Sequence, residues 1–92
     1  MGVDYSYERA VITNLFSTGI TTAELCSVAV ICAKILNIKI DRNSKRTFNG
    51  LLGWFRKNWD EVMKVLPYMA LYDDNYEKID YNTEVKKVLD NA

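Results

Sequence analysis

The stretch TTAELCSVAVICAKIL, residues 21–36, has the strongest helix signals in the chain. Thr21 and Glu24 stand three residues apart, so their side chains can form a capping box at a helix N-terminus. Ile20 and Leu25 occupy the two positions of a hydrophobic staple across the same start. Apolar residues then continue on nearly all sides, which is typical of a helix at the centre of a domain. The capping box and the length favour a helix over a strand, although several residues are β-branched.

A helix is predicted on each side of this central segment. The first begins at Ser6, whose hydroxyl can cap free backbone N–H groups, and buries a stripe led by Tyr7. The next is predicted to begin after a cap at Ser44 and to run without a break to Pro67, which lacks an N–H and stops it. Its apolar face is marked by Phe48, Leu51, Leu52, Phe55, Trp59, Val62 and Leu66.

Residues 68–81 leave two alternatives open. Four tyrosines surround Asp73-Asp74-Asn75, so the segment forms either a short β-hairpin turning there or a helical turn followed by a loop. Asn82 is a suitable cap for a short final helix. The predicted fold is mainly α: one globular domain of residues 1–92, a compact bundle of four helices, with the hairpin near residues 68–81 as an open alternative.

Cysteine usage and hydropathy predict a cytoplasmic protein. Cys26 and Cys32 would lie on opposite sides of a helix, so we expect two separate reduced thiols rather than a disulfide. The first 24 residues have acidic residues where a signal peptide has a basic region and an apolar run. Lys34 and Lys39 interrupt the most apolar stretch before it reaches membrane-spanning length.

The residue types argue against an enzyme. The 92 residues include no histidine, the side chain most often used for proton transfer at neutral pH. Phosphate-binding glycine loops and zinc-ligand spacings are also missing from the sequence. We therefore expect no catalytic residue, no metal and no cofactor.

The net charge of zero conceals an uneven distribution. Residues 1–33 carry −2 and residues 65–92 carry −3, whereas residues 34–64 have eight basic and three acidic side chains, a net charge of +5. An ordinary solvent-exposed surface can account for this charge distribution without any ligand. A positive segment is, however, what a phosphate-binding protein shows.

The polar side of the third predicted helix adds to this pattern. Helical spacing places Arg46, Asn49, Gly53 and Arg56 along one line, with Gly50 beside them. Arginine and asparagine are the side chains that pair with guanine and adenine edges in the major groove. The two glycines cost helix stability, so they indicate close approach, either of a partner's backbone or of another helix of this domain.

The order of these parts resembles that of helix-turn-helix domains, and loosely their winged-helix branch. A helix ending in Ala33-Lys34-Ile35-Leu36-Asn37-Ile38 is followed by a turn and by a helix opening Ser44-Lys45-Arg46-Thr47-Phe48. In that family the second of these helices enters the major groove of DNA. The resemblance implies a DNA-binding, transcription-regulating domain. The nucleic-acid-binding residues that we predict are Arg42, Lys45, Arg46, Thr47, Asn49, Arg56 and Lys57.

A second hypothesis is a small inhibitor or adaptor that binds a host protein, of the kind that phages and other mobile elements encode. The acidic, tyrosine-rich segment from Tyr68 to Tyr81 motivates it, since tyrosines provide contact area at little entropic cost. Trp54 falls off the apolar face, so it either points outward, toward a partner or a second copy in a homodimer, or packs under the C-terminal segment. The predicted protein-interface residues are Trp54, Tyr72, Asp73, Asp74 and Tyr76.

Overall fold

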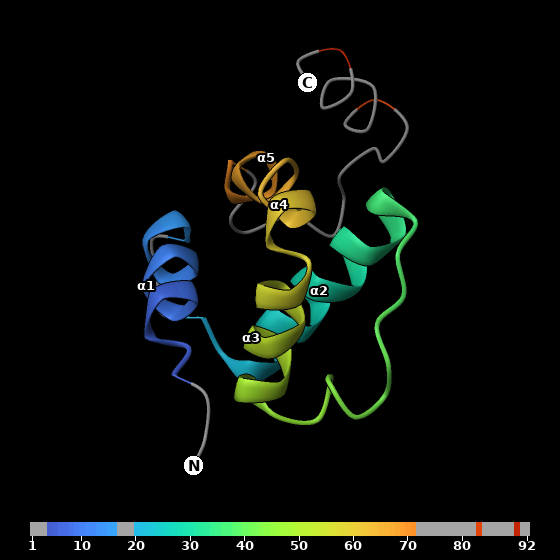
Figure 1. The fold of residues 1–92 in the computed structure, drawn as a ribbon. Helices are drawn as coiled ribbons and strands as arrows, with labels where there is room; N and C mark the ends of the chain where they lie inside the picture. Colours follow the sequence, from blue (N-terminus) through green and yellow to red (C-terminus); the bar gives the residue numbers. More distant parts are fainter. Residues whose placement is uncertain (1–3, 17–19, 72–82, 84–89, 91–92) are drawn as a thin grey trace.

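The computed structural model describes residues 4–16 and 20–71, together with the single residues 83 and 90. These residues form a compact, mainly helical arrangement without a strand (Figure 1). Its helices are α1 (Ser6–Leu15), α2 (Thr22–Leu36), α3 (Phe48–Lys57), α4 (Trp59–Val62) and α5 (Leu66–Ala70). The mainly α class is therefore confirmed, but the described residues alone contain five helices where four were predicted.

Helix α2 is the central element, and its predicted start is confirmed. The Glu24 N–H donates to Thr21 Oγ1 at 3.2 Å, and the Thr21 N–H donates to Glu24 Oε1 at 3.1 Å. Along the helix, Leu25, Val28 and Cys32 are fully buried. Helix α2 packs against both α3 and α4, so its buried side chains form the middle of the core.

The C-terminus of α2 is closed by Asn37 in the left-handed conformation, with φ 54° and ψ 44°. This geometry lets the Ile38 N–H donate to the Ala33 carbonyl at 3.0 Å, as in a Schellman motif. Asparagine tolerates positive φ better than most residues with a side chain. The cap therefore turns the chain into the connector, residues 37–47, which leads to α3.

Helix α1 begins at Ser6 as predicted, but its cap and its buried face differ from the prediction. Asp4 Oδ1 accepts both the Ser6 N–H, at 2.8 Å, and the Ser6 hydroxyl, and these bonds hold the pKa of the Asp4 carboxyl below its ordinary value. Tyr7, expected inside, is 66% exposed, whereas Glu8 and Ile12 are buried. The centre of the Tyr7 ring instead lies 5.8 Å from the centre of the ring of Trp59, the first residue of α4.

The prediction of one continuous helix to Pro67 is wrong. The chain leaves helical geometry at Asn58, whose side-chain amide donates to the Trp54 carbonyl at 2.9 Å. Helix α4 follows directly, and Pro67 lies in the first turn of α5, where its missing N–H costs nothing. The apolar periodicity continues across these breaks because residues such as Val62 and Leu66 still face the core.

The core joins α1, α2 and the α3–α5 segment. Its largest fully buried side chains include Phe16, Phe55, Leu51 and Leu52. Tyr68 to Ala70 are helical in α5, so of the two open alternatives the helical turn is confirmed for these residues and the hairpin is wrong for them. Leu71 follows as the C-cap of α5, while residues 72–81 lie outside the described residues, as does the predicted cap at Asn82.

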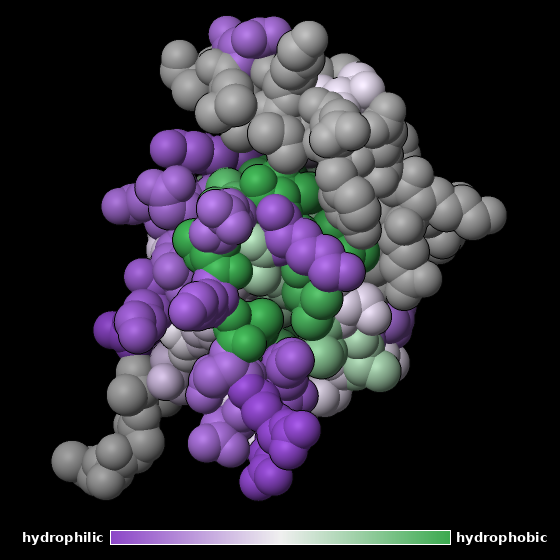
Figure 2. Space-filling model, turned by 90° about the vertical axis from the view of Figure 1, so that its right-hand side faces the viewer, coloured by the Kyte–Doolittle hydropathy of each residue, from purple (hydrophilic) through white to green (hydrophobic). Residues whose placement is uncertain are grey.

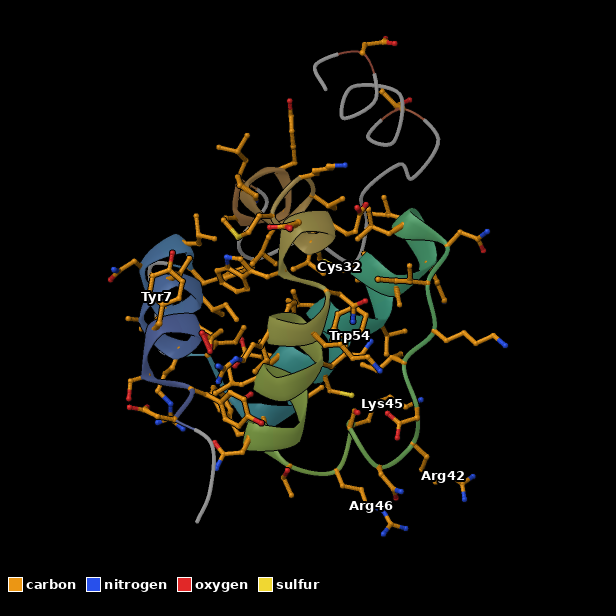
Figure 3. All side chains as sticks on the ribbon, viewed as in Figure 1. Tyr7, Cys32, Arg42, Lys45, Arg46 and Trp54 are labelled. Atoms are coloured by element: carbon orange, nitrogen blue, oxygen red, sulfur yellow. The ribbon has the colours of Figure 1, made fainter. Side chains whose placement is uncertain are left out.

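Both cysteines are free, as predicted. Cys32, on α2, is buried against α5 (Figure 3). Its Sγ lies 3.2 Å from Sδ of Met69 on α5. Burial raises the pKa of the Cys32 thiol to about 12. Cys26 is half-buried.

The Asn37 cap yields a stability prediction with a matched pair of variants. Asn37→Gly should leave the free energy of unfolding within about 0.5 kcal/mol of the parent, because glycine adopts positive φ freely. Asn37→Ala should lower it by about 1 kcal/mol, since a β-carbon disfavours the left-handed region. Urea unfolding followed by circular dichroism measures both, and equal stability of the two variants would contradict the assigned cap.

The cysteines should differ in reactivity toward a disulfide reagent such as dithiobis(nitrobenzoic acid). At pH 8 a thiol with a pKa near 12 is ionised in only about one molecule in ten thousand, and only the thiolate attacks. In the folded protein Cys26 should therefore react first, and Cys32 only as the protein unfolds. Cys26→Ser provides the comparison, and rapid labelling of that folded variant would show that Cys32 is accessible.

Candidate nucleic-acid interface

The connector runs over the surface beside α3 and is held to it at a defined point (Figure 1). The Trp54 indole N–H donates to the Lys39 carbonyl at 2.8 Å. Further along, the Ser44 hydroxyl donates to Asp41 Oδ1, and the Lys45 N–H donates to the Arg42 carbonyl at 3.2 Å. These bonds fold residues 41–46 into a turn.

This turn carries a cluster of positive charge, the basic tip, formed by Arg42, Lys45 and Arg46. All three residues are exposed, and the side chains of Arg42 and Arg46 point away from the body of the molecule (Figure 3). In the view of Figure 2, hydrophilic residues gather at the lower end of the molecule, below a hydrophobic patch. The structure thus brings together three of the predicted nucleic-acid-binding residues.

The other predicted residues are arranged differently from the expectation. Thr47, not Ser44, caps α3, because the Ser44 hydroxyl bonds Asp41 while Thr47 Oγ1 accepts the Gly50 N–H at 2.9 Å. Arg46 therefore precedes the helix, and the prediction that it shares a helical row with Asn49 is wrong. Asn49, Arg56 and Lys57 are exposed on α3, as the prediction requires.

Arg56 is partly engaged within the protein. Its guanidinium carbon lies 5.9 Å from the centre of the Tyr5 ring, and Nη1 donates to the Asp4 carbonyl at 3.5 Å. The chain before α1 thereby packs beside the polar face of α3. The remaining N–H groups of Arg56 can still donate to a ligand, but in this structure the side chain contacts the protein's own Tyr5 and Asp4.

The two glycines of α3 are explained by contacts inside the domain. A β-carbon on Gly50 would lie 2.8 Å from the Ser44 carbonyl oxygen, which is closer than real contacts allow. A β-carbon on Gly53 would lie 3.1 Å from the Tyr5 hydroxyl. The close approach comes from this domain itself rather than from a partner, but from the connector and the N-terminal segment and not from another helix as predicted.

Of the two alternatives that the sequence left open for Trp54, the outward-pointing one is wrong. The residue is only 6% exposed, packs edge-on against Phe55 with ring centres 5.2 Å apart, and uses its N–H to hold the connector. A buried indole needs such an acceptor, and the turn of the chain provides one. Tyr72, Asp73, Asp74 and Tyr76, the other predicted interface residues, lie outside the described residues.

A cleft of about 520 Å³ lies between the connector and α3. Lys39, Asp41 and Ser44 line it from the connector. Asn49, Gly50, Gly53, Trp54, Lys57 and Asn58 line it from α3, while Tyr5 and Ile38 complete its walls. The Ser44 hydroxyl, assisted by the charge of Lys57, holds the pKa of the Asp41 carboxyl below its ordinary value. The cleft therefore places a carboxylate and a nearby ammonium group on its two walls.

Sequence reasoning missed Tyr5, Lys39 and Asp41 as residues of this site. Only the fold brings Tyr5 to Gly53, because the two lie far apart in the chain. The turn from Asp41 to Ser44 could have been predicted from the sequence, since aspartate and serine at this spacing form hydrogen bonds within turns. Among the described residues, no cluster of three metal-ligating side chains is present, and no helix is long and apolar enough to cross a membrane.

Comparisons of this chain with protein-family models, with curated proteins and with solved structures found no match.

The glycine contacts predict opposite effects for two alanine substitutions. Gly50→Ala should lower the free energy of unfolding by about 1–3 kcal/mol, because backbone at 2.8 Å must move to admit the methyl group. Gly53→Ala meets only the end of a tyrosine side chain. In a Tyr5→Phe background it should therefore raise stability by up to about 1 kcal/mol, the gain in helix propensity.

Urea unfolding of the two alanine variants, each compared with its own parent, tests this difference. A stabilised Gly50→Ala protein would show that the connector does not pack on α3 as described.

Proposed function

We propose that this protein is a non-enzymatic nucleic-acid-binding domain, with duplex DNA as its leading target and transcription regulation as its role. The observation that carries the proposal is the basic tip: three exposed cations on one turn that is itself fixed to the helical core. Phosphate groups are the natural counterpart of such a cluster, because each neutralised phosphate releases bound counterions.

The residues next to the basic tip support contact with more than phosphate. Asn49 is exposed in the first turn of α3, and Lys57 is exposed in the last. An asparagine amide can pair with the donor and acceptor of an adenine edge. The likeness to helix-turn-helix domains rests on the order of α2, the connector of residues 37–47 and α3. In this proposal the basic tip, rather than a helical row, makes the first phosphate contacts.

Salt dependence tests the proposal. Binding to a duplex of about 20 base pairs, followed by fluorescence anisotropy, should weaken steeply as salt rises. The triple variant Arg42→Gln, Lys45→Gln, Arg46→Gln should reduce the slope of log K against log salt by about 3, roughly one unit for each lost phosphate contact.

Lys64→Gln provides the matched control, because Lys64 is exposed, pairs with Glu61 at 3.6 Å and belongs neither to the basic tip nor to the lining of the cleft. It should retain the slope of the parent protein. Absence of any complex at low salt, or an unchanged slope in the triple variant, would rule out the basic tip as the contact surface.

A further inference from the structure

We propose that the cleft between α3 and the connector receives one unpaired guanine base of the bound nucleic acid. This inference rests on the proposed function and specifies the ligand group that the site recognises beyond phosphate. Its consequence is tighter binding to a duplex that is locally opened at a guanine than to a fully paired duplex.

The dimensions and composition of the cleft suit a base. Its volume of about 520 Å³ falls within the range of about 300–1,000 Å³ found for small-ligand sites. Tyr5 provides aromatic surface and Ile38 apolar surface in its walls, to which the Trp54 ring, 6% exposed, adds little. Proteins that recognise unpaired bases combine aromatic or apolar surface with a few hydrogen-bonding groups in this way.

The charged groups of the cleft match the pairing edge of guanine. That edge presents an acceptor, O6, next to two donors, the N1–H and the N2 amino group. Lys57 can donate to O6 while the Asp41 carboxylate accepts the two N–H groups, and both residues line the cleft. Thymine, cytosine and adenine lack two adjacent donors, so they leave part of the carboxylate unpaired.

The Asp41 carboxylate is held ready for this role. The Ser44 hydroxyl donates to Oδ1, which fixes its orientation and leaves Oδ2 and the second lone pair of Oδ1 to the two N–H groups of a ligand. Its lowered pKa, due first to that bond and further to the charge of Lys57, keeps the group ionised well below neutral pH. An ionised carboxylate is a stronger acceptor than a neutral one.

The cleft and the basic tip are parts of one structure. Asp41 and Ser44, which line the cleft, are the chain neighbours of Arg42 and Lys45, which carry the positive charge. A nucleotide whose base enters the cleft would therefore have its phosphates close to the basic tip. This arrangement links base recognition to backbone binding through a single turn.

Trp54 provides a direct probe, because it lines the cleft and becomes the sole tryptophan in a Trp59→Phe variant. Titration of this variant with deoxyguanosine, which has no phosphate, should give a saturable change in fluorescence. Deoxyadenosine, deoxycytidine and thymidine should require at least about tenfold higher concentrations. Asp41→Asn retains an oxygen to accept the Ser44 hydroxyl but loses the charge, and it should abolish the preference, as should Lys57→Gln.

Lys64→Gln is again the control and should preserve the preference. Circular dichroism of each variant establishes that it is folded. An absent response to deoxyguanosine, or equal responses to all four nucleosides, overturns the inference, and salt-dependent binding of duplex DNA then leaves the proposed function standing. A guanine preference without any nucleic-acid binding overturns the proposed function and keeps the cleft as a site for a free guanine compound.

Discussion

The position of the connector and the basic tip beside α3 depends on one contact, the hydrogen bond from the Trp54 indole to the Lys39 carbonyl. It fastens an otherwise irregular connector to a helix whose other face forms the core. A buried indole N–H without an acceptor would be unfavourable, so the pairing restricts where the connector can lie. The turn beyond it, and with it the basic tip, is thereby set beside α3.

The glycines of α3 belong to the same constraint. Gly50 admits the Ser44 carbonyl and Gly53 admits the Tyr5 hydroxyl, so two segments from different parts of the chain approach one helix closely. Glycine weakens a helix by up to about 1 kcal/mol, which here is offset by the packing it permits. The cleft results from these two approaches, because the connector and Tyr5 form walls around the polar face of α3.

Sequence patterns predicted some elements well because the deciding interactions are local. The capping box of α2 involves residues three apart, and the predicted bonds are both present. The apolar periodicity of residues 48–66 identified side chains that are buried, but it did not reveal the break at Asn58. Local breaks such as this one preserve the direction of the apolar side chains, so they leave little trace in the pattern.

The sequence alone determined a mainly helical chain, a central capped helix, two separate thiols and a positively charged middle segment, since these follow from residue type and near spacing. Tertiary structure decided which residues face outward. It buried Glu8 and exposed Tyr7, turned Trp54 inward, and brought Tyr5 to the polar face of α3. Such outcomes depend on how each helix is rotated against its neighbours, and contacts between residues distant in the chain set that rotation.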